Sequence, residues 1–183
     1  KFYKLQNAGK GEAIKFGINK SKGDIISFFP SDNEYKVEDI ERVITPIILN
    51  QSMAVYGSRM IKVTTLNSEL QKIYKDNKIN LLLSKYGGKL INLFLFAFHE
   101  ISISDLFTSI KAFDSKLLKS LPLYRKGFDL EFEILTKLKK RKCFFLEVPI
   151  SFKPRNSKDG KKITIKEGIK CLFYVIFNKF YKS

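Results

Sequence analysis

The stretch GKGEAIKFGINKSKGDIISFFPSDNEY, residues 9–35, changes from helical to strand-like spacing and then becomes polar and acidic. Apolar residues recur at helical spacing after the opening glycines, which predicts a helix that closes at Gly23. The nearly continuous apolar run DIISFF follows, a pattern typical of a buried strand in a parallel sheet. We therefore expect a helix, a strand and a polar loop in direct succession.

The next segments repeat this alternation. YKVEDIERVITPIILN, residues 35–50, has its apolar side chains along one helical face, and MAVYGS, residues 53–58, has the pattern of a second strand. Helices that alternate with strands indicate an α/β fold with a mostly parallel central sheet flanked by helices. A chain of 183 residues is long enough to bury one sizeable core.

The polar loop after the first strand carries Asp32 and Glu34, two residues apart. Open α/β sheets bind ligands beyond the carboxyl ends of their strands. Two carboxylates there can hold a hard cation such as Mg²⁺ or Mn²⁺, which in turn holds a diphosphate. The alternative is structural, because Asp32 or Asn33 can also cap the helix that follows. The pattern alone leaves both interpretations open.

The composition is strongly basic, with 34 Lys and Arg against 18 Asp and Glu and a formal net charge of +16. This excess favours polyanionic partners such as nucleic acid, anionic lipid or phosphorylated substrates, although a coding bias toward AT-rich codons also enriches lysine. We exclude nucleic acid, because the basic residues alternate with acidic ones and no helix-turn-helix, zinc or RNP pattern is present. Cys143 and Cys171 lack CxxC spacing, which fits a reducing cytoplasm.

Two apolar segments point to a membrane surface rather than to a membrane span. The run LINLFLFAF, residues 90–98, is far shorter than the roughly 20 residues that cross a bilayer. Residues 165–183 predict a basic amphipathic helix whose apolar face consists of Ile165, Ile169, Leu172, Phe173, Ile176 and Phe180. We expect a peripheral protein on the cytoplasmic face of the membrane. Packing of this helix on the protein's own sheet is the alternative.

Further motifs follow the opening stretch in order: AVYGSRM, GGKLINLFLFAF, ISDLFTSIKAFD, GFDLEFEILTKLKKR and EVPISFKPRNSKDGKKI. Together they resemble the family 2 glycosyltransferases, in particular the branch of dolichyl- or polyprenyl-phosphate mannose synthases. The resemblance implies an A-type (Rossmann-like) glycosyltransferase fold, a nucleotide-sugar donor, a Mg²⁺ or Mn²⁺ ion and a lipid-phosphate acceptor. The first strands of the family have no counterpart here, so we expect that an N-terminal part is missing. The catalytic domain would span residues 1–164, and the amphipathic helix residues 165–183.

The same resemblance places the family's metal-binding Asp-x-Asp motif at the end of the first strand. Its second aspartate falls on Asp32 and a frequent further ligand on Glu34, whereas its first aspartate falls on Pro30, which offers no side-chain ligand. We interpret Pro30 as a subfamily variant of a working metal site. The alternative is a non-catalytic glycosyltransferase-like protein that is associated with the membrane.

Other site residues also follow from the resemblance. Those on the donor side are Gly9, Lys10, Gly11, Asp32 and Arg59; those on the acceptor-phosphate side are Lys111, Arg155, Lys161 and Lys162; the candidates for catalysis are Asp105, Asp129 and Glu131. Ordinary structural explanations remain for each group, such as a glycine turn, a surface cation or a carboxylate that interacts with a helix dipole.

The chemistry of the acceptor separates two mechanisms. A sugar hydroxyl would need a general base, for which Asp105 and Asp129 are the candidates. A lipid phosphate is already an anion, so it needs cations that hold it against the donor diphosphate. The excess of Lys and Arg favours the lipid phosphate, with Arg59, Arg155 and Lys161 positioning the two anions.

Overall fold

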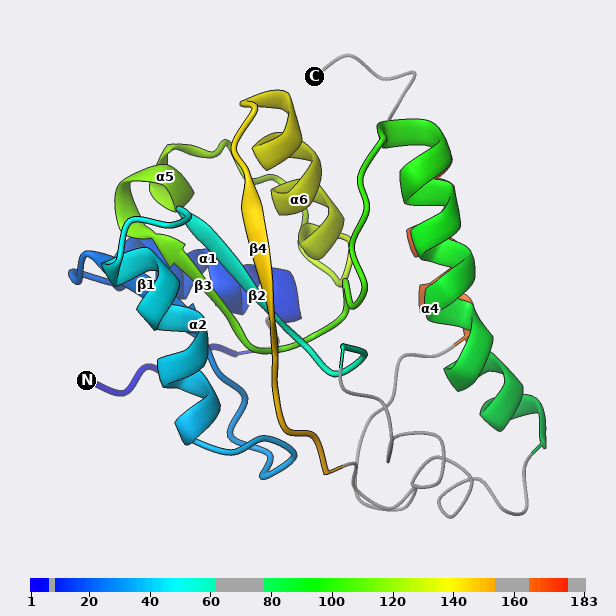
Figure 1. Cartoon of the computed structure of the whole chain (residues 1–183), viewed down its shortest axis with the longest axis horizontal. Coiled ribbons are helices and arrows are strands. Elements are labelled where there is room, and N and C mark those ends of the chain that lie inside the picture. The colour runs from blue at the N-terminus through cyan, green and yellow to red at the C-terminus, as the bar shows by residue number, and fades with distance from the viewer. Residues whose placement is uncertain (7–8, 62–77, 154–164, 178–183) are drawn as a thin grey trace.

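The computed structural model describes residues 1–6, 9–61, 78–153 and 165–177, with the backbone alone for residues 78–85 and 165–167. Helices and strands alternate along much of the chain (Figure 1). The elements are α1 (Lys10–Lys20), β1 (Ile25–Phe28), α2 (Glu38–Ile48), β2 (Ala54–Ser58), α4 (Lys78–His99), β3 (Lys111–Asp114), α5 (Ser115–Ser120), α6 (Leu130–Lys140), β4 (Phe145–Pro149) and α7 (Ile165–Phe177). The predicted α/β class is confirmed.

The strands of the described residues form one sheet in the order β1-β3-β2-β4. β2 and β4 are parallel, whereas β3 lies antiparallel between β1 and β2. β1, β2 and β4 therefore share one direction, as predicted for a mostly parallel sheet, and β3 runs against them, which makes the sheet mixed. β3 is antiparallel because the chain enters it at the edge where β1 and β2 end, with Lys111 opposite Phe28 and Tyr56.

Helices cover both faces of the sheet, which is why its strands are so apolar. One face carries Ile26 and Phe113 and packs in a cluster with residues of α1, α4, α6 and α7. The opposite face carries Val55 and packs against Val43 and Ile47 of α2. Figure 1 shows α2 in front of the strands and α1 behind them. The apolar cores on the two faces hold the sheet rigid, so loops at its edge have a fixed base.

The first helix ends earlier than predicted, at Lys20 rather than near Gly23. Ser21 follows in an extended conformation, and its hydroxyl donates to the Ile18 carbonyl at 2.6 Å. This bond satisfies one of the carbonyl groups that a helix end leaves without a partner. Gly23 does not have a positive φ, so it does not provide the expected glycine cap.

The helices α4 and α7 pack against each other. His99 at the end of α4 donates through Nε2 to the Val175 carbonyl of α7 at 2.7 Å, which gives this histidine a structural role. α7 buries Cys171 and Val175 in the core and exposes Ile169 and Phe173. Among the described residues, no helix combines the length and the hydropathy of a membrane span.

Helix α1 begins in close contact with the loop before α6. The Gly11 N–H donates to the Lys126 carbonyl at 3.0 Å. A Cβ on Gly11 would lie 2.6 Å from the Lys126 carbonyl carbon and 2.9 Å from the Gly127 oxygen, and a Cβ on Gly9 would lie 2.8 Å from the Lys126 oxygen. The glycines of GKG therefore allow two backbone segments to approach, and their contact with a donor stays a prediction.

We expect Gly11→Ala to lower the free energy of unfolding by about 3 kcal/mol, because the new Cβ meets backbone atoms that cannot rotate away. Gly17→Ala in the same helix is the matched control. Nothing lies within 4 Å of a Cβ at Gly17, and alanine favours a helix over glycine by up to about 1 kcal/mol. Urea denaturation measures both variants, and equal stability would contradict the close approach.

Candidate functional site

Segments from several parts of the chain meet at the edge of the sheet where β1, β2 and β4 end and β3 begins. The strand register places Phe28, Lys111, Tyr56 and Glu147 side by side in one row across the sheet. Beyond this row, the chain continues from the ends of β1, β2 and β4 and arrives through the loop before β3. An edge of this kind is where open α/β sheets bind ligands.

The loop after β1 carries Asp32 and Glu34, both half-buried. The Glu34 N–H donates to Asp32 Oδ1 at 3.3 Å, and Asn33 between them has a φ of 59°. Helix α2 begins only at Glu38, and its N-cap residue Val37 provides no side-chain cap. The capping interpretation is therefore wrong, because neither Asp32 nor Asn33 lies at the helix start. Asp32 instead orders the turn that carries Glu34.

This turn is fixed against the segment that follows β4. Tyr35 is buried, and its ring centroid lies 5.2 Å from that of Phe152. The Lys153 N–H donates to the Glu34 carbonyl at 2.8 Å. On the other side, the Arg59 guanidinium lies 4.8 Å from the centroid of the same Phe152 ring. The loops after β1, β2 and β4 thus form one connected surface.

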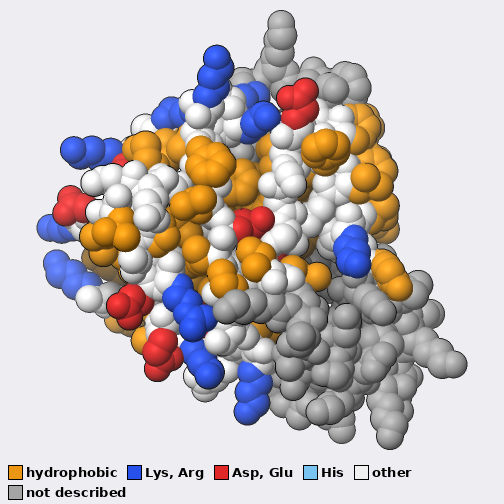
Figure 2. Space-filling model, in the orientation of Figure 1, with side chains coloured by type: hydrophobic (Ala, Val, Ile, Leu, Met, Phe, Trp, Pro, Cys, Tyr) orange, Lys and Arg blue, Asp and Glu red, His pale blue; other side chains and the backbone are white. Residues whose placement is uncertain are grey.

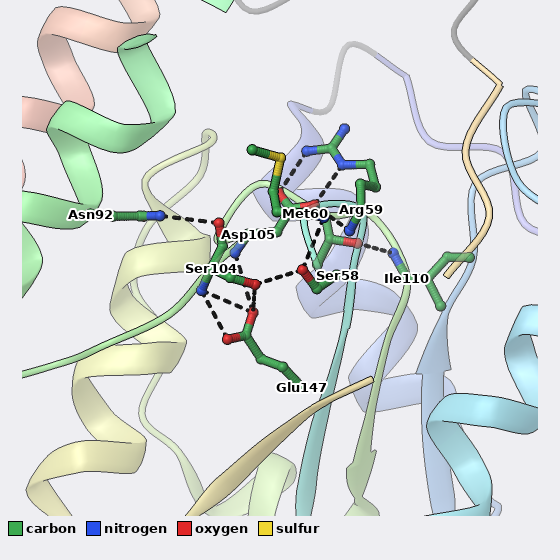
Figure 3. Close-up of polar contacts among 9 residues, drawn as sticks. Ser58, Arg59, Met60, Asn92, Ser104, Asp105, Ile110 and Glu147 are labelled. Carbon is green, nitrogen blue, oxygen red and sulfur yellow. Dashed lines mark hydrogen bonds and ion pairs between the residues drawn. The ribbon is translucent and has the colours of Figure 1, made fainter. Parts of the chain in front are cut away.

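Arg59 and Asp105 form a bidentate ion pair at this surface (Figure 3). Arg59 donates from Nε to Oδ2 at 2.6 Å, from Nη2 to Oδ1 at 2.7 Å and from its backbone N–H to Oδ2 at 3.0 Å. Burial lowers the pKa of the guanidinium, but Asp105, Tyr35 and Glu34 raise it, and the net pKa lies above the ordinary value. Both Asp105 oxygens accept from Arg59, which suits orientation of the arginine better than removal of a proton.

Three polar residues beside this pair were not identified from the sequence: Ser58, Ser104 and Glu147. The Glu147 carboxylate accepts from the Ser104 N–H at 2.8 and 3.0 Å, from the Ser104 hydroxyl at 2.7 Å and from the Asp105 N–H at 3.2 Å. Ser104 Oγ lies 2.6 Å from Ser58 Oγ. A signal for Glu147 was present, because it is the one charged residue between Lys142 and Lys153 and lies in an apolar strand.

Lys10, Glu131 and Lys111 form a second charged cluster. Glu131 Oε1 lies 2.9 Å from Lys10 Nζ, and Oε2 pairs with Lys111 Nζ. Glu131 and Lys111 are buried, whereas the Lys10 side chain is 32% exposed. Burial raises the pKa of Glu131, but the Lys111 and Lys10 ammonium groups lower it more, so the net pKa lies below the ordinary value. Burial also lowers the pKa of Lys111, and Glu131 opposes this shift.

The position of this cluster follows from the fold. Lys10 is the first residue of α1, Lys111 is the first of β3, and Glu131 lies in the first turn of α6. Three elements distant in the sequence therefore converge on one buried carboxylate. A carboxylate held between two ammonium groups suits the placement of the lysines more than proton transfer.

Asp129 lies at the N-cap position of α6, next to this cluster. Its Oδ1 accepts from the Gly127 N–H at 3.1 Å, and Arg125 Nη1 lies 3.9 Å from Oδ2. Asp129 thus orders the loop against which the start of α1 packs. The predicted phosphate ligands Arg155, Lys161 and Lys162 lie outside the described residues.

Asp32 and Glu34 fit the oxygen-donor chemistry of a hard divalent cation. The described ranges contain no group of three or more His, Cys, Asp and Glu side chains that could hold a metal. A Mg²⁺ ion, however, often binds only one or two protein carboxylates and completes its shell with water and substrate phosphates. The two carboxylates on one ordered turn are compatible with an ion that a diphosphate completes, and Pro30 adds no side-chain ligand.

The mixed sheet, its helical layers and the charged edge define an α/β protein with a candidate ligand site where its strands end. The chain belongs to glycosyl transferase family 2, whose model matches residues 1–118. It is 31% identical over 150 residues to the UDP-N-acetylglucosamine–dolichyl-phosphate N-acetylglucosaminyltransferase of Methanococcus voltae, covering 79% of this chain and 55% of that protein. It is 27% identical over 172 residues to the dolichyl-phosphate beta-glucosyltransferase of Saccharomyces cerevisiae, covering 87% and 48%. The chain spans about half the length of these relatives.

Solved structures confirm the predicted A-type glycosyltransferase fold. The glucosyl-3-phosphoglycerate synthase of Mycobacterium tuberculosis matches with a TM-score of 0.59 at 18% identity, covering 93% of this chain and 54% of that one. The same enzyme in complex with Mn²⁺, UDP-glucose and phosphoglyceric acid matches with a TM-score of 0.56 at 17% identity, with the same coverage. Within this fold, a divalent metal and a UDP-sugar are therefore bound together by at least one enzyme.

Proposed function

We propose that the protein transfers a sugar from a nucleotide-sugar donor to a polyprenyl phosphate. In this proposal, the chain supplies the part of the site that binds the donor diphosphate and the acceptor phosphate. The observation that carries it is the sheet edge where the Asp32–Glu34 turn, the Arg59–Asp105 pair and Lys111 converge. Support comes from membership of the family and from two relatives whose names include dolichyl phosphate. We propose UDP as the nucleotide, because the relative from Methanococcus voltae is named for a UDP-sugar.

Each charged group has a role in this proposal. Asp32 and Glu34 would hold Mg²⁺ or Mn²⁺, and the ion would supply positive charge that stabilises the donor diphosphate. The guanidinium of Arg59 and the ammonium group of the partly exposed Lys10 bind phosphate oxygens. Lys111 keeps Glu131 charged and in place. A phosphate acceptor carries its own negative charge, so no side chain has to remove a proton from it.

A saccharide hydroxyl as acceptor would require a base. Asp105 is 6% exposed and already accepts from Arg59, whereas the side chain of Asp129 is 28% exposed. Asp129 is therefore the better placed base for that alternative. A sugar-transfer assay with each acceptor separates the two alternatives.

The proposed function is tested with radiolabelled UDP-N-acetylglucosamine and UDP-glucose, Mn²⁺, and either a polyprenyl phosphate in detergent micelles or a saccharide as the acceptor. We expect the label to move into the organic phase on extraction, and EDTA to stop this transfer. A folded protein that labels only a saccharide acceptor would contradict the lipid acceptor. A folded protein that labels neither acceptor would contradict the enzymatic function.

We also propose that the paired helices α4 and α7 lie against the membrane that carries the acceptor. Their exposed side chains include Leu93, Phe96, Ile169 and Phe173, between 49% and 62% exposed. Figure 2 shows hydrophobic side chains along the right-hand edge, where Figure 1 places α4. The sequence of α4 contains three lysines and no Asp or Glu. An apolar face on a helix that also exposes Lys89 complements the interface of an anionic bilayer.

Vesicle flotation tests this orientation with the double variant Leu93→Gln, Phe173→Gln. We expect at least about a tenfold loss of binding to vesicles that contain anionic lipid, because each apolar side chain contributes about 1.5–3 kcal/mol when fully buried. The matched control is Val37→Gln, Phe144→Gln, which changes equally exposed side chains outside α4 and α7. Equal binding by both variants would contradict this face as the contact surface.

A further inference from the structure

Glu147 carries a half-buried carboxylate on β4, in a stretch that is otherwise apolar. Figure 3 shows this carboxylate directed at the loop that carries Ser104 and Asp105. Its oxygens accept from two consecutive backbone N–H groups and from the Ser104 hydroxyl. Hydrogen bonds to an ionised acceptor are roughly twice as strong as neutral ones. One side chain of the sheet therefore holds a loop that has no regular secondary structure.

We infer that Glu147 is a positioning residue for the Asp105–Arg59 pair. Asp105 is held at two points, since its backbone N–H donates to Glu147 and its carboxylate accepts from Arg59. Glu147 lies on β4, and Arg59 directly follows β2, the parallel neighbour of β4, so both points are anchored to the rigid sheet. Glu147 thereby fixes Asp105 in the place from which it orients the guanidinium.

Ser104 extends this link to the loop after β2. Its hydroxyl lies 2.7 Å from Glu147 Oε1 and 2.6 Å from Ser58 Oγ. Ser58 Oγ in turn accepts from the Met60 N–H at 3.1 Å. The residues on both sides of Arg59 are therefore tied to the same network (Figure 3). Loss of the Glu147 charge would loosen both the partner of Arg59 and the turn that contains Arg59.

The consequence for donor binding rests on the proposed function, in which Arg59 meets phosphate oxygens. A guanidinium binds phosphate bidentately only in a defined orientation. The geometric part of the inference does not depend on any ligand. Two separate measurements therefore test the two parts.

Backbone amide hydrogen exchange, resolved by residue with NMR, tests the geometric part in the full protein. In Glu147→Gln we expect faster exchange at Ser104 and Asp105 and at least about tenfold faster exchange at Arg59, relative to the buried strand residue Val55. The Arg59 amide donates to Asp105 and not to Glu147, so its acceleration reports transmitted positioning. Glu147→Ala removes both acceptors, and we expect a larger effect than in the glutamine variant.

Glu133→Gln is the matched control. Glu133 is a buried glutamate on a regular element, and like Glu147 it accepts from two consecutive N–H groups, those of Tyr124 and Arg125. We expect faster amide exchange at those two residues and an unchanged exchange rate at Arg59. Unchanged Arg59 exchange in Glu147→Gln, with acceleration at Ser104 and Asp105, would overturn the positioning role.

Calorimetric titration with UDP and Mn²⁺ tests the functional part. We expect Glu147→Gln to raise the dissociation constant of UDP at least about tenfold, and Glu133→Gln to leave it unchanged. Equal affinity in Glu147→Gln and the wild type would overturn the link to donor binding. If the wild type binds no nucleotide, the proposed function fails, and the exchange experiment still decides whether Glu147 positions Arg59.

Discussion

Replacement of Glu131 with alanine is expected to lower the free energy of unfolding by about 3–5 kcal/mol. Glu131 is the buried partner of Lys111, which is only 1% exposed, and it also pairs with Lys10. Its removal leaves the Lys111 ammonium group buried without a counter-ion, and a buried charge without a partner is among the most destabilising changes in a core. Urea denaturation at neutral pH measures the loss.

Two further variants show whether the loss comes from the unpaired charge. Glu12→Ala removes the exposed partner of Lys126, and we expect a change of at most about 1 kcal/mol. The double variant Glu131→Leu, Lys111→Met removes both buried charges, and we expect it to recover most of the stability. An equally small effect of Glu131→Ala and Glu12→Ala would contradict the buried pair.

The pH dependence of this pair follows from its pKa shifts. The net pKa of Glu131 is lowered, so its contribution to stability is present above about pH 4.3, the ordinary glutamate value, and is lost as the pH falls through the folded pKa. The pKa of Lys111 is lowered by burial, so between its folded pKa and about 10.4 the unfolded state binds more protons and stability rises with pH. Glu131 opposes this lowering, so its removal lowers the Lys111 pKa further. In Glu131→Ala, we therefore expect the loss of stability to shrink between pH 7 and pH 10.

Asp32→Ala is expected to reduce Mn²⁺-dependent UDP binding at least about a hundredfold, which corresponds to roughly 2.7 kcal/mol. In the proposed site, Asp32 is one of two carboxylates that hold the metal, and it also orders the turn that carries Glu34. Asp32 lies in a loop outside the core, so the variant should keep its fold. Calorimetric titration measures the affinity, and circular dichroism checks the fold.

Asp24→Ala is the matched control for this variant. Asp24 is an exposed aspartate that directly precedes β1, whereas Asp32 follows the other end of the strand. Its replacement should leave UDP affinity unchanged. Retained Mn²⁺-dependent binding in a folded Asp32→Ala protein would contradict the assignment of Asp32 as a metal ligand.

Much of the fold was predictable because its signals are local. The helical spacing before Gly23, the apolar run at Ile25 and the one-sided helix after Tyr35 each report a burial pattern within a few residues. The direction of β3 was not predictable in this way. Its four residues, Lys111–Asp114, are too few to indicate whether the strand is parallel or antiparallel to its neighbours. That direction depends on the edge of the sheet at which the preceding segment delivers the chain to β3.

In the candidate site, too, local features were predictable from the sequence and contacts between distant residues were not. The acidic turn at Asp32 was found because it follows a strand in the sequence, and Arg59 was found through the resemblance to the glycosyltransferase family. The pairing of Arg59 with Asp105 and of Lys111 with Glu131 joins residues from separate elements, and spacing carries no information on such contacts. Glu147 was missed because a single acid in a strand is weak evidence until its four hydrogen-bond contacts are seen.

The most direct test of the central claim is a calorimetric titration of the protein, in its full natural length, with UDP and GDP in the presence and absence of Mn²⁺. A nucleotide-sugar transferase with a metal site at Asp32 and Glu34 should bind UDP in the presence of Mn²⁺ and much more weakly without it, and should discriminate against GDP. Absence of binding to either nucleotide, in a protein that circular dichroism shows to be folded, would contradict the account.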